Sequence, residues 1–182
     1  MKDFFTVGSD GYVLLILIFV ACVVGVLLMR QTKPRKKTRA EELQEQYATL
    51  TEMLLADTPE DQLVTAVVAN LMGKLPRRRP DPLMTFPKLG LSRCAVYFVW
   101  LMMKEIEHNG VDALKGKDAA RFNEMGIEGL KMVTATATAD AVTAFLETDG
   151  HPDAVIAAIE KEQPLVRLAE YIRANPAEFT DE

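Results

Sequence analysis

The sequence predicts an all-α protein, with a single N-terminal transmembrane helix followed by one compact multi-helix domain. Residues 11–29 form an uncharged apolar run, and the rest of the chain shows helical spacing with helix start and stop signals but no convincing β-type alternation. With 182 residues, the chain is long enough to bury one globular core in addition to the apolar segment.

The apolar segment at residues 11–29 reads GYVLLILIFVACVVGVLLM and contains neither a charged residue nor a proline. A helix of this length spans about 28 Å, close to the hydrocarbon thickness of a bilayer. A cleaved signal peptide is the main alternative, but its apolar region usually covers about 7–15 residues and ends at a small-residue cleavage site. This run is longer and continues to Arg30 without such a site. We therefore expect an uncleaved anchor whose partner is the lipid bilayer.

The charges on either side of the anchor predict its orientation. Residues 1–10 contain one basic and two acidic residues, whereas segment 30–39 carries only basic charges: Arg30, Lys33, Arg35, Lys36, Lys37 and Arg39. Because Lys and Arg stay on the cytoplasmic side, we expect residues 1–10 outside and residues 40–182 as a cytoplasmic domain at the plasma (inner) membrane. The cluster fits a topology signal first, and it would also attract anionic headgroups by about 1 kcal/mol per residue.

The expected domain is much more acidic than the whole chain. The first 39 residues hold seven basic and two acidic residues, which leaves 14 basic and 24 acidic residues in 40–182, a net charge of −10. A surface of this charge repels nucleic acid and suits a basic protein partner. We therefore expect no direct nucleic-acid binding.

The sequence offers no recognisable catalytic, metal or cofactor site. Cys22 lies in the apolar segment and Cys94 in a second apolar run, so the two cysteines form neither a disulfide framework nor a zinc site, as is usual in a reducing cytoplasm. Zinc-protease and phosphate-loop motifs are missing. We expect no metal, no cofactor and no enzymatic activity.

The first helix of the domain is predicted to begin after Thr38, which has capping-box spacing with Glu41. It should continue to about residue 56 through apolar residues at helical spacing: Leu43, Tyr47, Leu50 and Leu54. Two turns of pattern do not establish a coiled coil, but this stripe would pair two chains if the protein had a purely structural role. A second helix is predicted with Thr58 as N-cap and Pro59 at its first position, ending near Leu75.

The middle of the chain predicts a proline-rich loop and then a buried helix. Residues 76–91 contain four prolines and the arginine run 77–79, which fits a solvated loop better than a phosphate site. Ser92 can cap the next helix, where residues 94–103 read CAVYFVWLMM. Ten residues are too few to span a bilayer, so this segment should be the central helix of the core. Further helices are predicted at about 118–133, from the cap Thr138 to Glu147, and from Pro152 and Pro164.

The stretch KEIEHNG at residues 104–110 admits two interpretations. Glu105 and His108 share one helix face and could form an acid–base pair. Alternatively the stretch ends the central helix, with Asn109 and Gly110 turning the chain through a left-handed cap and His108 complementing the helix dipole. The helix end is favoured, because no nucleophile or phosphate-binding motif accompanies the pair.

Two groups of residues resemble a known family. Glu105, Asn109 and Gly110 match a Glu-x-x-x-Asn-Gly-Gly element, with Val111 in place of the second glycine. The tail matches a Tyr-Ile-x-x-x-Pro-x-x-Phe element at Tyr171, Ile172, Pro176 and Phe179. The chain is thus similar, over about residues 43–180, to the small helical domain family typified by a bacterial DNA-mimic protein. The aromatic-rich segment that the family carries after the first element is replaced here by DALKGKDAARF.

The resemblance implies an acidic helical domain whose carboxylates imitate phosphates and occupy a DNA-binding protein. We therefore expect a membrane-anchored, non-enzymatic interaction module that presents its acidic domain to a protein partner. The alternatives are an immunity or inhibitor protein against a basic toxin or nuclease, and an unrecognised enzyme that uses Glu105 and His108. The candidate partner-binding residues are Glu105, Asn109, Gly110, Glu160, Glu162 and Glu170.

Overall fold

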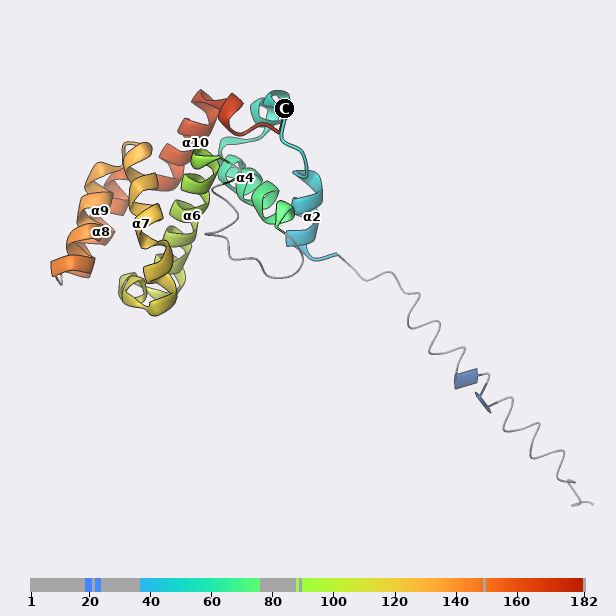
Figure 1. The fold of residues 1–182 in the computed structure, drawn as a ribbon, viewed down its shortest axis with the longest axis horizontal. Helices are drawn as coiled ribbons and strands as arrows, with labels where there is room; N and C mark the ends of the chain where they lie inside the picture. Colours follow the sequence, from blue (N-terminus) through green and yellow to red (C-terminus); the bar gives the residue numbers. More distant parts are fainter. Residues whose placement is uncertain are drawn as a thin grey trace, which may run out of the picture. The chain divides into compact units, whose positions relative to one another are not determined.

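A computed structural model describes residues 19–20, 22–23, 37–75, 88, 90–148 and 150–181 of the chain. All regular secondary structure in these residues is helical, which confirms the all-α class (Figure 1). The chain divides into two units, Met1–Lys37 and Thr38–Glu182.

The predicted anchor falls almost entirely outside the described residues. Of residues 11–29, four are described, and they are helical and exposed: Phe19, Val20, Cys22 and Val23. Of the basic cluster, Lys37 and Arg39 are described and exposed, whereas Arg30, Lys33, Arg35 and Lys36 lie outside the described residues. Within the described part of the chain, no helix combines the length and the apolar character that crossing a bilayer requires.

Within its described residues, the second unit is built from α-helices and short 3₁₀ helices. In chain order they are α2 (Arg39–Gln46), α3 (Glu52–Asp57), α4 (Glu60–Lys74), α6 (Leu91–Asn109), η2 (Val111–Lys115), α7 (Lys117–Met132), α8 (Thr136–Thr148), α9 (Pro152–Glu162), α10 (Pro164–Ala174) and η3 (Pro176–Glu178). The predicted helix starts at Pro152 and Pro164 are confirmed. The predicted loop 76–91 lies mostly outside the described residues, between α4 and α6.

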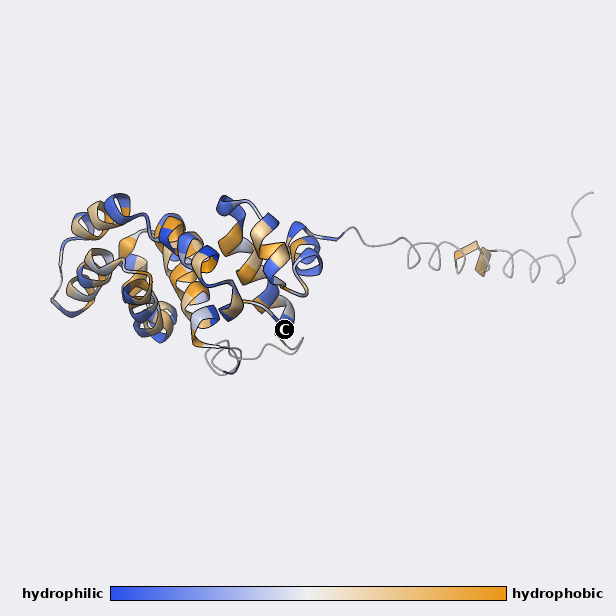
Figure 2. Ribbon diagram, turned by 90° about the horizontal axis from the view of Figure 1, so that it is seen from above, coloured by the Kyte–Doolittle hydropathy of each residue, from blue (hydrophilic) through white to orange (hydrophobic). Residues whose placement is uncertain are grey.

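Helix α6 is the centre of the domain, as the apolar run predicts. It packs against α4, α7 and α10, and Figure 1 shows it between α4 and α7. Figure 2 shows hydrophobic residues in orange along the helices of the domain. In α6 the buried apolar residues include Cys94, Val96, Phe98, Val99 and Met102, each at most 1% exposed. The helix begins without a side-chain cap after Gly90, whose φ of +114° favours glycine. The predicted cap was wrong, because the Ser92 hydroxyl instead donates a hydrogen bond to Glu178.

The N-terminal part of the domain differs from the prediction. The capping box of Thr38 and Glu41 is confirmed, but a turn after α2 interrupts the expected helix, and Thr51 caps α3 by accepting from the Leu54 amide at 3.2 Å. Tyr47 and Leu50 are 2% and 0% exposed. Leu43 and Leu54 are partly buried and pack against the same core, so the apolar stripe packs into the domain itself.

Two predicted threonine caps act differently in the structure. The Thr58 hydroxyl donates to the Leu54 carbonyl at 2.7 Å, so Thr58 ends α3, and α4 begins after Pro59. Thr138 lies inside the first turn of α8, which begins two residues before the predicted cap. The break before α8 comes at Thr134, a residue with a φ of +61°.

Candidate functional site

The stretch KEIEHNG ends α6, as the favoured interpretation predicts. The side-chain Nδ2 of Asn109 donates to Glu105 Oε1 at 2.8 Å, and His108 Nδ1 contacts the Lys104 carbonyl oxygen at 2.9 Å. Gly110 has φ +81° and ψ 169°, an extended conformation with positive φ that replaces the expected left-handed cap. These contacts close one helix turn, and they direct Glu105 and His108 to different partners rather than to each other.

The three predicted partner-binding residues of α9 and α10 differ in exposure and in their contacts. Glu160 and Glu170 are exposed on α9 and α10. Glu162 instead caps the start of α8: its carboxylate accepts from the Ala137 and Thr138 amides at 3.2 and 2.7 Å, and from the Thr138 hydroxyl at 2.9 Å. Burial acts to raise the pKa of Glu162, but the hydrogen bonds from Thr138 and Ala137 hold it below its usual value. This carboxylate is therefore already used within the domain.

No group of three or more His, Cys, Asp or Glu side chains in the described part of the chain is arranged to hold a metal ion. Cys94 is fully buried in α6, and burial raises the pKa of its thiol to about 11. A thiol of this kind is a poor nucleophile and a poor ligand at neutral pH.

The surface of the domain carries an apolar hollow of about 480 Å³ between α4, α6 and α10. Trp100 of α6 and Leu165 of α10 contribute its largest apolar side chains, together with Val64 of α4. Glu60 and Asp61, in the first turn of α4, lie at its edge. The hollow therefore combines an apolar lining with negative charge.

A second hollow, of about 530 Å³, lies between α6, α9 and α10. Met103 and Ile106 of α6 line it from one side, and Ile156 and Ile159 of α9 from the other. Both hollows are lined by Leu165 and Val166 of α10, so they adjoin along α6. We refer to the two hollows together as the α6–α10 groove.

Apolar side chains in this groove are accessible to solvent. Val166 is 45% exposed and Ile156 is 37% exposed. The second hollow is bordered by Glu107 and by Glu160, the one predicted partner-binding residue that lines the groove. Lys104 lines the first hollow and forms an ion pair with Glu107, which lowers the pKa of the Glu107 carboxyl. The charged residues that line the groove are thus mainly acidic.

The groove was not predicted from the sequence, because its apolar residues have the spacing of ordinary core positions. In α10 the residues Leu165, Val166, Leu168, Ala169 and Ile172 are apolar. Leu168 and Ile172 are fully buried, whereas Val166 faces outward. An apolar arc wider than one buried face was the available signal.

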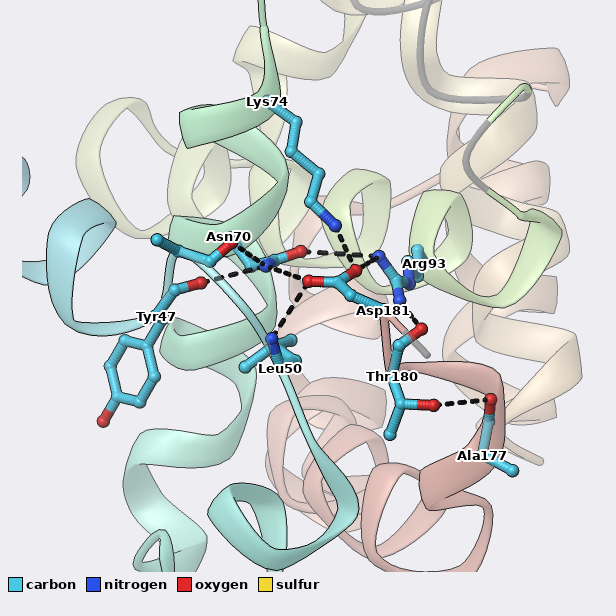
Figure 3. A network of polar contacts seen from close by, with 9 residues as sticks. Tyr47, Leu50, Asn70, Lys74, Arg93, Ala177, Thr180 and Asp181 are labelled. Carbon is cyan, nitrogen blue, oxygen red and sulfur yellow. Dashed lines mark hydrogen bonds and ion pairs between the residues drawn. The ribbon is translucent and has the colours of Figure 1, made fainter.

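A second cluster holds the C-terminus against the domain (Figure 3). Asp181 Oδ1 accepts from Arg93 Nη1 at 2.7 Å and forms an ion pair with Lys74, while Oδ2 accepts from the Leu50 amide and Asn70 Nδ2, both at 3.0 Å. Arg93 also donates to the Thr180 carbonyl. The Arg93 and Asp181 side chains are 6% and 14% exposed, so the cluster is a structural clasp rather than an accessible site.

The clasp predicts a dependence of stability on pH. Burial acts to raise the pKa of the Asp181 carboxyl, but hydrogen bonds from Lys74, the Leu50 amide, Arg93 and Asn70 hold it well below its usual range. Because the folded pKa is depressed, the stabilisation is complete above the unfolded pKa of about 4 and is lost as the pH falls below it.

Urea unfolding between pH 6 and pH 3 should therefore show a steeper loss of stability for the wild type than for Asp181→Asn. The difference should reach up to about 1.4 kcal/mol per pH unit below pH 4. Equal pH slopes for the two proteins would contradict an ionised Asp181 in the folded state.

Comparisons with protein-family models, curated proteins and solved structures yield no match to this chain. Its function must therefore be inferred from the residues and their geometry.

Proposed function

We propose that the chain is a membrane-anchored, non-enzymatic interaction module that presents an acidic helical domain to a protein partner in the cytoplasm. The observation that carries this proposal is the α6–α10 groove, where apolar side chains are accessible beside acidic ones. Accessible apolar surface bordered by polar residues is typical of protein-binding sites.

The sequence supports the membrane part of the proposal. Residues 11–29 have the length and apolar character of a transmembrane helix, and the basic segment 30–39 favours a cytoplasmic domain. An anchored domain meets its partner at the membrane surface, which restricts the search for both proteins.

The acidity of the domain supports a basic partner. The resemblance to the DNA-mimic family points the same way, since that family presents carboxylates to a DNA-binding protein. An immunity or inhibitor protein against a basic toxin is a specialised form of the same proposal. Protection of cells from such a toxin on co-expression would identify this form.

Fractionation and photo-crosslinking of the full chain in cells test the proposal together. The chain should remain in membranes after an alkaline wash. A green fluorescent protein fused to its C-terminus should fluoresce, as expected for a C-terminal domain in the cytoplasm. A photo-reactive residue in place of Val166 should give a crosslinked protein adduct. The same photo-reactive residue in place of Met53, which is 75% exposed and lies outside the groove, should not give this adduct.

Release of the chain by the alkaline wash would contradict the anchor. Identical adduct patterns from the two positions would contradict partner binding at the groove. A substrate turnover that is abolished by alanine at Glu105 and His108, with folding intact, would contradict the non-enzymatic function.

A further inference from the structure

We propose that the α6–α10 groove binds one amphipathic helix of the partner, with bulky apolar residues along one face and basic residues at both ends. This inference rests on the proposed function and specifies the chemistry of the partner.

The shape of the groove supports a helical ligand. Its two hollows measure about 480 and 530 Å³ and adjoin at Leu165 and Val166. Each hollow is therefore a separate place for apolar side chains of the ligand helix. Along α6 the second hollow is displaced from the first by roughly one helical turn, from Trp100 and Lys104 to Met103, Ile106 and Glu107. A ligand helix with apolar residues at i, i+3 or i+4, and i+7 places successive apolar side chains about one helical turn apart, which matches the displacement of the two hollows.

The negative charges at the groove favour basic residues at both ends of the ligand helix. Glu60 and Asp61 border the first hollow, and Glu107 and Glu160 border the second. Lys104 is the single cation among the lining residues and is paired with Glu107, so Glu60, Asp61 and Glu160 carry the excess negative charge. Glu60 and Asp61 also suit the first turn of α4, where acidic residues stabilise a helix. Glu160 has no such role, since it lies in the last turn of α9, where a negative charge is unfavourable.

The same charges disfavour the two other available occupants. A second copy would bring another domain of net charge −10 against the acidic border of the groove. The cytoplasmic leaflet is itself anionic and would also repel this border. A helix with basic ends is the occupant that satisfies both the apolar lining and the charge.

Trp100 gives the experiment a built-in probe, because it is the only tryptophan of the chain and lines the first hollow. The full chain in neutral detergent micelles is titrated with a tryptophan-free synthetic helix that has leucines at i, i+3, i+4 and i+7 and lysines at both ends. We expect a blue shift of the Trp100 emission on binding. A matched peptide with glutamates in place of the lysines should bind about tenfold more weakly, and added salt should reduce this difference.

Matched variants assign the binding to the groove. Val166→Glu and Ile156→Glu place a charge on exposed groove positions and should weaken the binding of the lysine peptide about tenfold or more. Met53→Glu and Leu91→Glu make the same change at positions that are each 75% exposed and outside the groove, and they should leave the affinity unchanged. All four variants share the same micelle background.

Three results would overturn the inference: equal weakening by the groove and control variants, equal binding of the two peptides, or a blue shift produced by raising the chain concentration alone. The last result would identify a second copy as the occupant. If the peptide fails but the crosslinks from Val166 in cells persist, the helical ligand is wrong and the proposed function stands. If both fail, the proposed function is also wrong.

Discussion

Replacing Asp181 with asparagine is expected to lower the free energy of unfolding by about 2–4 kcal/mol, because it removes one partner of a largely buried ion pair. Asparagine keeps the shape of the side chain, so no cavity is created. The Arg93 guanidinium, only 6% exposed, would keep the Thr180 carbonyl and a long contact of 3.4 Å to Asn70 Oδ1 but lose its counter-charge. For a domain of this size, the melting temperature should fall by roughly 10 °C.

A double-mutant cycle separates this effect from the loss of a single contact. Arg93→Met should also destabilise. The double variant should be less destabilised than the sum of the two singles, because it removes both charges of the Arg93–Asp181 pair and leaves neither of them buried without its partner. Glu124→Gln on the exposed side of α7 is the control and should change stability by less than about 0.5 kcal/mol. Additive effects of Asp181→Asn and Arg93→Met would show that the ion pair does not hold the C-terminus.

The clasp explains why the N-terminal part of the domain could not be predicted from the sequence. The expected helix from 38 to 56 breaks because Asn70 Nδ2 donates to the Tyr47 and Ala48 carbonyls at 2.9 and 3.2 Å, and because Leu50 pairs with Asp181 in both directions. These bonds join residues more than 20 positions apart, whereas helical spacing reports only on neighbours along the chain. Tertiary contacts therefore override the local pattern here.

Helix ends were predictable where their cause is local. Gly110 ends α6 because glycine readily adopts a positive φ, and Pro152 and Pro164 begin α9 and α10 because proline has a fixed φ. Hydroxyl caps were less predictable, because a hydroxyl has several possible partners. Ser92 bonds to Glu178, which lies 86 residues away, instead of capping α6.

The candidate site was predicted only at Glu160. Glu105 was chosen through the family resemblance, and Glu162 through the acidic charge of the C-terminal segment. In the structure, Glu105 bonds to Asn109 within its own helix and Glu162 caps α8. The groove depends on which apolar side chains of α9 and α10 remain uncovered after packing. That selection is set by the arrangement of helices around α6. The wide apolar arc of α10 indicates that more than one of its faces is apolar, but not which face stays uncovered.

Replacing Gly129 with alanine is expected to destabilise the domain by about 1–3 kcal/mol, although alanine is the better helix former. Gly129 lies in α7 where it crosses α6, and an added Cβ would approach Val99 Cγ2 at 2.7 Å and the Ala95 carbonyl oxygen at 3.0 Å. The Ala95 contact is to backbone, so relief requires the two helices to separate. Separation of α6 from α7 would loosen the packing of the core at Cys94, Phe98 and Met102.

Two other helical glycines provide the matched series. At Gly126 an added Cβ would clash with the terminal methyl of Met102, but this flexible side chain can change rotamer, so Gly126→Ala should cost less stability than Gly129→Ala. At Gly73 the nearest atoms belong to Gln44 at 3.7 Å, an ordinary contact, and Gly73→Ala should stabilise by about 0.5 kcal/mol through helix propensity. Urea unfolding should thus rank the stabilities as Gly73→Ala, wild type, Gly126→Ala and Gly129→Ala, from highest to lowest. A Gly129→Ala variant as stable as the wild type would mean that α6 and α7 do not pack backbone to backbone at this crossing.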